Sequence, residues 1–155
     1  MVELTLPENS KANAPAGYSG TPLAAKLGFK DGMRAAFVAL PSSLDALARS
    51  VDFARVERPE DWRGVSDNMP PFDVIHAFTK SRAEIEDHLP ALQSAIRRDG
   101  MIWVSWPKKA SKMPTDVTED VVRDAALKLD LVDVKVAAID EIWSGLKLVI
   151  RKDRR

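Results

Sequence analysis

The stretch VDVKVAAIDEIWSGLKLVI, residues 132–150, decides the fold of this chain. It holds two runs rich in β-branched and aliphatic residues, 133–139 and 146–150, and such runs are typical of strands. Only residues 140–145 connect them, whereas a crossover between parallel strands needs about a dozen residues or more. We therefore expect the last strand to run antiparallel to the one before it, as a hairpin.

Strand and helix patterns alternate upstream of this hairpin. The strand-like runs are residues 33–40, 53–57, 72–79 and 101–106. The helical patterns are residues 21–28, 42–48, 81–96 and 116–129. This alternation is typical of a mostly parallel sheet with right-handed crossovers. The predicted fold class is α/β: a Rossmann-like three-layer sandwich whose mostly parallel sheet ends in a C-terminal antiparallel hairpin strand.

Local signals mark the ends of these helices. Thr21 can cap the first helix, which is expected to stop at Gly28. Ser81 and Glu84 form the capping-box pattern at the start of the third helix. Asp116 is expected to cap the last helix. The helix boundaries are therefore predicted from side chains as well as from hydrophobic spacing.

Proline and glycine interrupt the pattern at three places. Residues 59–71 hold three prolines and a glycine, so we expect a loop there. Pro90 lies within the third helical pattern and should kink that helix. Asp99 and Gly100 are expected to form the turn before the fourth strand.

The composition is that of one globular domain with balanced charge. Lys plus Arg and Asp plus Glu each number 23, which argues against general nucleic-acid binding but not against a local basic patch. Cysteine is absent from the sequence, which excludes disulfides, thiolate metal sites and cysteine nucleophiles. The chain shows neither a signal peptide nor an apolar run of roughly 20 residues. We expect a cytoplasmic protein without membrane contact, with residues 1–16 as a flexible arm and residues 17–155 as a single domain.

Four phrases of the sequence resemble an uncharacterised family of bacterial proteins. They are GYSGTPLAAKLG (17–28), WPKKAS (106–111), TDVTEDVVRDAAL (115–127) and VDVKVAAIDEIWSGLKLV (132–149). The terminal hairpin also resembles the S-adenosylmethionine-dependent methyltransferase fold. LGFKDGMR (27–34) is similar to the approach to that fold's first strand, and AIRRDGMIWV (95–104) to one of its helix-to-strand passages. The resemblance implies a distant methyltransferase-like fold.

The sequence departs from the methyltransferase pattern where the cofactor would bind. Methyltransferases follow the first strand with a glycine-rich loop, which lets the backbone approach the cofactor closely. In this chain the strand leads into ALPSSL, residues 39–44, which holds no glycine, and Pro41 lacks a backbone donor. Glu57, near the end of the second strand, is a candidate ribose-binding acid. We expect no cofactor, and no methyltransferase-like affinity for S-adenosylmethionine.

Basic and polar side chains follow several of the predicted parallel strands. Ligands of open α/β sheets bind beyond the carboxyl ends of the strands, so we predict a small anionic ligand there. The helix after Ser81 and the loop at residues 17–20 would add backbone donors. The alternatives are solvated loop charges and, for residues 17–20, a plain turn. The candidate ligand-binding residues are Tyr18, Ser19, Ser42, Lys80, Arg82, Trp106, Lys108, Lys109, Asp140 and Trp143.

Other conspicuous side chains have simpler interpretations. His76 lies mid-strand among apolar residues and Trp103 lies within a strand, so both are expected in the core. Trp106 ends its strand and could line a pocket, whereas Trp143 could be a lid or fill a gap. The two histidines are far apart in the sequence, so we expect no metal site and leave the catalytic residues unassigned.

Three functional classes are consistent with these observations. The preferred hypothesis is a non-catalytic or ligand-sensing methyltransferase-like module that binds a small anionic ligand or a protein partner, which includes a homodimer. The alternative is an S-adenosylmethionine-dependent methyltransferase with a degenerate cofactor loop, which would make the chain a transferase. The third is an interaction subunit that works through another protein. Fold analogy by itself does not separate them.

Overall fold

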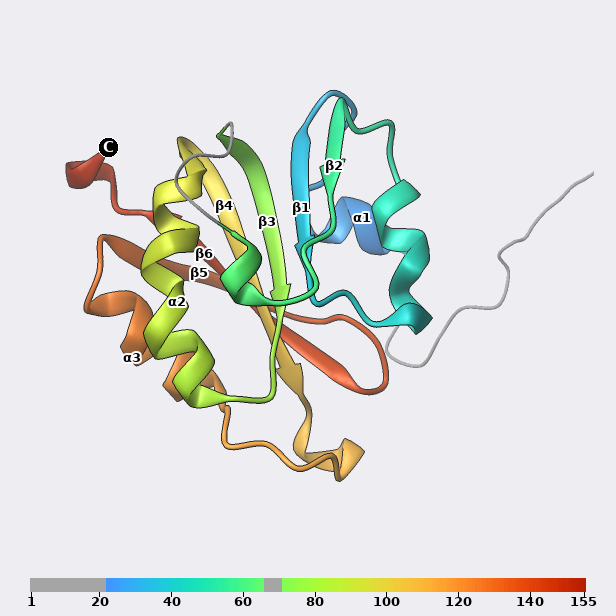
Figure 1. Ribbon diagram of the computed structural model, residues 1–155, viewed down its shortest axis with the longest axis vertical. Helices are drawn as coiled ribbons and strands as arrows, with labels where there is room; N and C mark the ends of the chain where they lie inside the picture. The colour runs from blue at the N-terminus through green and yellow to red at the C-terminus, as the bar shows by residue number, and fades with distance from the viewer. Residues whose placement is uncertain (1–21, 66–70) are drawn as a thin grey trace, which may run out of the picture.

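A six-stranded sheet in the order β2-β1-β3-β4-β6-β5 forms the middle layer of the computed structural model, which describes residues 22–65 and 71–155 (Figure 1). The strands are β1 (Arg34–Val38), β2 (Arg55–Glu57), β3 (Phe72–Phe78), β4 (Ile96–Pro107), β5 (Leu131–Ala138) and β6 (Trp143–Ile150). Strands β2, β1, β3 and β4 are mutually parallel, and β6 is antiparallel to both β4 and β5. This arrangement confirms the predicted mostly parallel sheet with an antiparallel hairpin strand.

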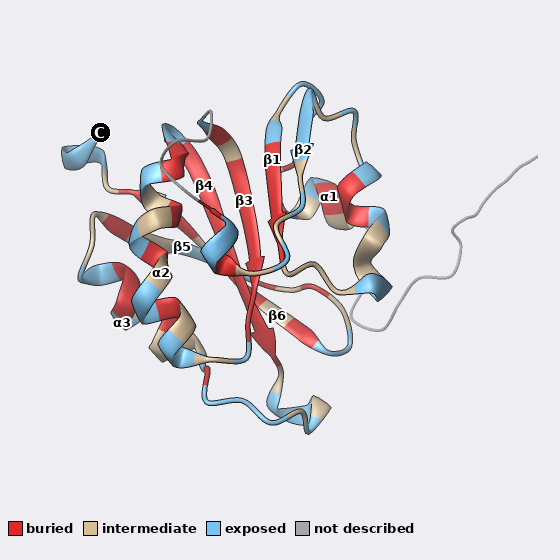
Figure 2. Ribbon diagram, in the orientation of Figure 1, coloured by how far each residue is buried: buried red, intermediate tan, exposed pale blue. Residues whose placement is uncertain are grey.

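Helical segments cover both faces of the sheet. One face packs against α1 (Leu23–Lys26) and η2 (Ser42–Arg49), and the other against η3 (Trp62–Gly64), α2 (Arg82–Ala95) and α3 (Glu119–Leu127). The short turns η4 (Lys109–Ser111) and η5 (Lys152–Arg154) lie outside these layers. Alternate β1 residues serve the two faces, since Ala36 belongs to the core under α2 and Phe37 to the core under α1. Figure 2 shows the central strands buried between the two layers, which confirms the predicted three-layer sandwich.

The turn of the terminal hairpin is held by one carboxylate. Asp140 Oδ1 accepts hydrogen bonds from the backbone N–H groups of Ile142 and Trp143 at 2.8 and 2.7 Å. The side chain thus closes the turn in the manner of an Asx turn. Because β6 begins at Trp143, the connection is shorter than residues 140–145 suggested.

The expected loop over residues 59–71 contains an ordered helical turn and a core residue. Asp61 caps η3 by accepting a hydrogen bond from the Arg63 N–H. Trp62 is fully buried, and its Nε1–H donates to the Phe78 carbonyl at 2.9 Å. Prolines correctly indicated irregular backbone, but an isolated tryptophan carries no periodicity that would place it in the core. Residues 66–70 lie outside the described part.

The expected turn at Asp99 and Gly100 is instead part of β4, which begins directly after α2 at Ile96. The pairing with β3 shifts register between Phe72 and Val74, so the strand carries an irregularity there. A Cβ atom at Gly100 would lie 3.0 Å from the Asp73 carbonyl oxygen and 3.1 Å from that of Phe72. Glycine is therefore required by close backbone approach, not by a reverse turn.

Helix ends agree with the sequence in part. Ser81 caps α2 by accepting from the Glu84 N–H, as predicted. Thr118, not Asp116, caps α3, since its hydroxyl accepts from the Val121 N–H at 3.2 Å. Helix α2 continues past Pro90 to its end. The proposed cap Thr21 lies outside the described residues.

Membrane-spanning segments are absent from the helices that the structure describes. Within residues 22–65 and 71–155, none combines the length and apolar character needed to cross a bilayer. The expectation of a cytoplasmic location stays a prediction.

Candidate functional site

The order of the sheet places a topological switch point between β1 and β3. From β1 the chain moves outward to β2 and then returns to add β3 on the other side of β1. In open α/β sheets, the crevice outside the carboxyl ends of the strands at such a point is the usual ligand site. The carboxyl ends of β1, β2 and β3 are therefore the first place to look for a function.

A segment of the chain itself crosses this edge. We call residues 58–65, which follow β2 and include η3, the strap (Figure 1). The Ala39 N–H at the end of β1 donates to the Pro59 carbonyl at 2.9 Å. Further along, the buried Trp62 side chain bonds to the Phe78 carbonyl at the end of β3. The strap is thus fastened to both strands that flank the switch point.

A cavity of about 360 Å³ remains beside the strap, at the carboxyl ends of β1 and β2. It is lined by Phe37, Ala39, Leu40, Arg58, Pro59 and Glu60. Arg58 reaches away to an ion pair with Asp45 of η2, and its hydrogen bond holds the pKa of that carboxyl below the usual range. Glu60 therefore offers the cavity's carboxylate, while Leu40 and Pro59 offer apolar wall.

Ala39 has an unusual backbone conformation at the point where β1 ends. Its φ is +56°, in the left-handed region that glycine tolerates and that other residues enter at a cost of about 1–2 kcal/mol. The chain therefore makes the kind of bend that a glycine loop makes after a first strand, with alanine in the bending position. Unlike an open glycine loop, it has already given this residue's N–H to Pro59.

Two acids lie near the end of β2, and Glu57 is the one predicted for ribose binding. Glu57, the last residue of β2, pairs with Arg55 at 2.8 Å on the exposed edge strand. Glu60, three positions later, is the acid that lines the cavity. Ser42, another predicted site residue, is the exposed first residue of η2. Glu57 is therefore engaged by Arg55, whereas Glu60 lies on the cavity wall, and the predicted role of Glu57 stays a prediction.

The predicted residues after β3 are bound to the loop that precedes α3. Asp116 Oδ1 accepts from the Arg82 N–H at 2.7 Å, so a carboxylate of the chain occupies the N-terminus of α2. The Arg82 side chain pairs with Glu86 at 2.8 Å. Lys80 is exposed, and its carbonyl accepts from the Thr115 hydroxyl at 2.8 Å. Of this group, the Lys80 ammonium extends into solvent.

Lys108 and Lys109 begin a projecting loop after β4. The Lys108 N–H donates to the Ile142 carbonyl at 2.6 Å, which ties this loop to the turn of the terminal hairpin. Lys109 starts the turn η4 and is exposed. Together with Lys80, these lysines lie at the carboxyl edge of β3 and β4, as expected from the strand assignment.

The remaining predicted residues have evident structural roles. Trp106 is buried in the core under α2 and α3. Trp143 is buried on the opposite face, edge-on to Phe78 with ring centroids 5.3 Å apart. Asp140 closes the hairpin turn. Tyr18 and Ser19 lie outside the described residues, so their predicted contribution stays a prediction.

His76 and Ser105 form a buried polar pair in the middle of the sheet. His76 Nε2 lies 2.7 Å from Ser105 Oγ, and both residues are fully buried. His76 Nδ1 has no hydrogen-bond partner, and burial lowers the pKa of the ring to about 3. The ring stacks on Phe78 at 4.3 Å. This confirms the core position predicted for His76, as full burial does for Trp103.

Groups suited to a metal ion are not found among residues 22–65 and 71–155. No three His, Asp or Glu side chains gather there. The chemistry that the described edge offers is a carboxylate in a small cavity beside β1 and β2, and ammonium groups beyond β3 and β4.

Solved structures similar to this chain include several methyltransferases and an enzyme described as a pericyclic reaction enzyme. Magnesium protoporphyrin IX methyltransferase from Synechocystis PCC 6803, with bound S-adenosylmethionine, matches with a TM-score of 0.58 at 13% identity, over 83% of this chain and 74% of its own. A TehB-like S-adenosylmethionine-dependent methyltransferase from Corynebacterium glutamicum matches with a TM-score of 0.54 at 12% identity. The match covers 82% of this chain and 85% of that methyltransferase. A putative methyltransferase from Thermoplasma acidophilum matches with a TM-score of 0.54 at 11% identity. The match covers 85% of this chain and 75% of that protein.

These likenesses define the class of fold. The chain has a methyltransferase-like Rossmann fold, as its sheet order and terminal hairpin indicate. No family model matches the sequence, and no curated protein is similar to it in sequence. The resemblance to an uncharacterised bacterial family therefore stays a prediction.

Sequence reasoning missed three residues that shape this edge. Trp62 and Pro59 fasten the strap, and Glu60 lines the cavity. An acid within a few positions after a second strand is a usable signal, and Glu60 satisfies it as well as Glu57 does. Nothing local in the sequence indicates that the strap turns back across β1 and β3.

Proposed function

We propose that this chain binds S-adenosylmethionine in the cavity between the ends of β1 and β2, as a methyltransferase with a degenerate cofactor loop. The observation that carries the proposal is the position of the cavity, at the carboxyl ends of the first two strands of a methyltransferase-like sheet. Its volume of about 360 Å³ lies within the range of small-molecule sites, about 300–1,000 Å³.

The residues around the cavity fit this ligand in part. The Glu60 carboxylate can accept two hydrogen bonds from ribose hydroxyls. Leu40 and Pro59 supply apolar surface for a purine ring. The Ala39 N–H is engaged by Pro59, so a backbone donor that an open glycine loop would offer is missing. We therefore expect weaker binding than a glycine loop allows.

The role of the chain in such a reaction is positioning. When bound, S-adenosylmethionine supplies a methyl group on a sulfonium sulfur, which transfers to a nucleophile of the acceptor as the sulfur leaves as a neutral thioether. Holding the two reactants in line can lower the activation free energy by a large amount. Glu60 would hold the nucleoside end of the ligand, and the loops after β3 and β4 would hold the acceptor.

A thermal-shift and calorimetric titration with S-adenosylmethionine and S-adenosylhomocysteine tests the proposal. A ligand at about 100 times its dissociation constant adds roughly 2.7 kcal/mol to the free energy of unfolding, which raises Tm by about 5–10 °C for a chain of this size. Replacing Glu60 with Gln should weaken binding by about tenfold, because a charged acceptor is lost.

The matched control is Glu57→Gln, which removes the neighbouring acid but leaves the cavity lining unchanged. Binding by the wild type that falls in Glu60→Gln and not in Glu57→Gln supports the proposal. Absence of any Tm shift or heat at millimolar ligand in the wild type contradicts it.

The second candidate is a non-catalytic module with a methyltransferase-like fold. The observation that favours it is the strap, which crosses the switch point and engages the Ala39 N–H. Such a module would bind neither S-adenosylmethionine nor its product. The same titration therefore separates the two candidates.

A further inference from the structure

The loop after β4 is a rigid projection that carries three lysines. We call residues 108–113 the lysine finger. The Ser111 N–H and hydroxyl both donate to the Lys108 carbonyl, at 3.0 and 2.6 Å. The Met113 N–H donates to Ser111 Oγ at 3.2 Å. The Lys108 N–H also donates to the Ile142 carbonyl, so hydrogen bonds hold the backbone of the finger at both of its ends.

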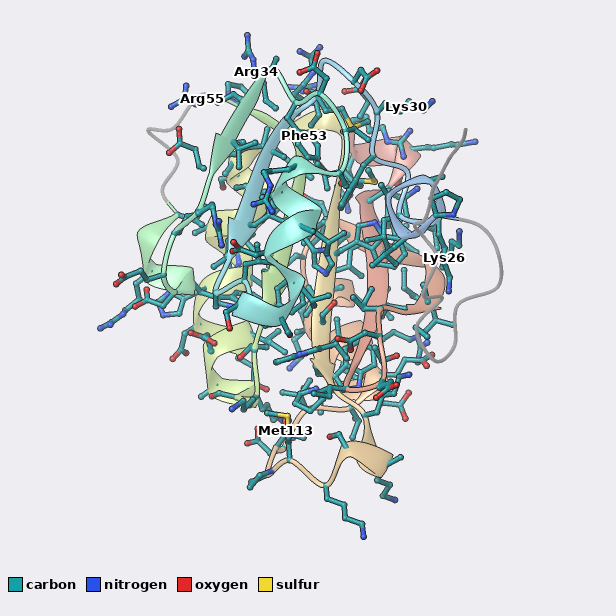
Figure 3. The ribbon with its side chains drawn as sticks, turned by 90° about the vertical axis from the view of Figure 1, so that its right-hand side faces the viewer. Lys26, Lys30, Arg34, Phe53, Arg55 and Met113 are labelled. Atoms are coloured by element: carbon teal, nitrogen blue, oxygen red, sulfur yellow. The ribbon has the colours of Figure 1, made fainter. Side chains whose placement is uncertain are left out.

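The finger lies at the carboxyl edge of the sheet. Figure 3 shows Met113 at the opposite end of the molecule from Arg34 and Arg55, which begin β1 and β2. Lys80, from the loop after β3, joins it there because its carbonyl accepts from Thr115, just beyond the finger. Lysines from two adjacent strand ends therefore share one edge.

The lysine ammonium groups of this edge form no ion pairs within the described structure. Among residues 22–65 and 71–155, every ion pair is made by an arginine. The nearby carboxylates of Asp116 and Asp140 accept from backbone N–H groups instead. Four lysines, Lys80, Lys108, Lys109 and Lys112, thus lie in two loops of the same sheet edge and form no ion pair with a carboxylate of the described residues.

Lys112 supplies an independent observation. Its φ is +62°, in the left-handed region where glycine is favoured. A lysine held in such a conformation is strained, and strain of this kind is concentrated at functional sites. Glycine would suit this backbone conformation better, and a functional role for the Lys112 side chain would account for the presence of lysine.

The chemistry of these groups indicates a phosphate. Carboxylates are commonly held by the planar fork of arginine, whereas lysine binds phosphate as a point charge from several directions. The edge also carries the exposed Glu141 next to Ile142, and the whole chain is electrically neutral. Both features disfavour an extended polyanion and favour a compact anion of high charge.

We propose that the lysine finger and Lys80 bind the phosphate groups of a small phosphorylated methyl acceptor. The role of this ligand as a methyl acceptor rests on the proposed function. The phosphate site does not, because it is inferred from the geometry of the finger. The acceptor class is thus a metabolite that carries a phosphate or diphosphate, with its nucleophile directed toward the carboxyl ends of β1 and β3.

The test is a titration of the full chain with inorganic pyrophosphate, monitored by calorimetry and by amide chemical shifts. The variant Lys108→Gln/Lys109→Gln/Lys112→Gln should lose at least tenfold in affinity, about threefold for each lysine of this open surface. The control Lys30→Gln/Lys128→Gln/Lys152→Gln removes the same charge elsewhere and should keep the wild-type affinity. Equal losses in the two triple variants, or no binding by the wild type, would overturn the site.

Lys112→Gly separates a ligand role from a structural one. Glycine relieves the positive φ, so Tm should stay the same or rise, while pyrophosphate affinity falls about threefold. A variant that binds pyrophosphate as the wild type does would contradict the proposal. Binding of single-stranded RNA without binding of pyrophosphate would also overturn it, in favour of a polymer surface.

Titrating S-adenosylmethionine into the same variants keeps the two proposals apart. Finger variants that bind S-adenosylmethionine normally but lose pyrophosphate support both proposals. If pyrophosphate binding depends on the finger and S-adenosylmethionine does not bind, the methyl-acceptor role is contradicted and the phosphate site is supported.

Discussion

At the scale of single residues, His76 is the group whose chemistry the fold changes most. The ring is fully buried among Phe37, Phe78 and Trp103, and burial depresses its pKa to about 3. The neutral imidazole is therefore the form that the folded state holds. An unfolded chain exposes the same ring to water, where its pKa is about 6.5.

This difference makes the free energy of unfolding depend on pH. The folded pKa is depressed, so the unfolded state binds more protons between pH 6.5 and 3. The contribution of His76 to stability is fully present above about pH 6.5 and is lost as the pH falls toward 3. We expect urea titrations to show a loss of about 2 kcal/mol between pH 7.5 and 5.

Two variants test the assignment to this residue. The double variant His76→Phe/Ser105→Ala removes the titrating ring and its hydrogen-bond partner together, and should flatten the profile over this pH range. His88→Gln, which removes the histidine of α2, is the matched control. An equally steep profile in the double variant would show that other groups are responsible.

Residue-level prediction from the sequence succeeded where a strand gave the context. His76 and Trp103 lie inside apolar strand runs, and both are core residues. Trp62 lies in a proline-rich segment without periodicity, so its complete burial was not predictable. The contrast between Glu57 and Glu60 has the same origin, because three-dimensional partners decide which acid lines the cavity.

At the scale of elements, the strap is the segment that joins the strand ends at the switch point. It contains the short turn η3, and Trp62 of this turn fills the core beneath it. Trp62→Ala should cost about 3–5 kcal/mol of unfolding free energy. Trp62→Phe, which keeps much of the volume but loses the bond to Phe78, should cost about 1–3 kcal/mol.

The control is Arg63→Ala in the same turn. Arg63 is exposed and pairs with Asp61 alone among the described residues, so its loss should change stability by about 0.5 kcal/mol or less. Chemical denaturation measures all three variants. A Trp62→Ala protein as stable as Arg63→Ala would show that Trp62 does not anchor the strap in the core.

The start of β4 offers a second test of element structure. Gly100 faces the carbonyl oxygens of Phe72, Asp73 and Arg97 at 3.0 to 3.1 Å from where a Cβ would lie. Since these are backbone atoms, Gly100→Ala should destabilise the protein by about 1–3 kcal/mol.

Ser94→Ala is the matched control for this substitution. It also leaves an alanine, by removing a hydroxyl on the exposed face of α2, and should be nearly neutral. If the Gly100 variant unfolds at the same urea concentration as the Ser94 variant, β4 does not approach β3 as closely as the Gly100 contacts require.

The elements themselves were largely predictable, and their junctions were not. Hydrophobic runs and capping residues indicated the strands and α2 within a few residues. Asp99 and Gly100 suggested a turn because local sequence does not distinguish a reverse turn from a close approach between strands. Asp116 suggested a cap because its real partner, the Arg82 N–H, is distant in sequence.

At the scale of the whole molecule, the length of the terminal connection decides the topology. Neither the six residues expected from the sequence nor residues 139–142 in the structure can complete a crossover, so β6 must run antiparallel to β5, and the sheet confirms this. Function is less determined at this scale, because one fold hosts many chemistries. The cavity beside β1 and the lysine finger beyond β4 are the two places where this chain's own side chains add information.

The central claim is that the cavity at the ends of β1 and β2 binds S-adenosylmethionine. Amide chemical shifts of the isotope-labelled full chain, recorded while S-adenosylmethionine is added, test it most directly. We expect saturable shifts concentrated at Ala39, Leu40 and Glu60, with the β5–β6 hairpin unaffected. Shifts absent at millimolar ligand, or confined to residues away from this cavity, would contradict the claim.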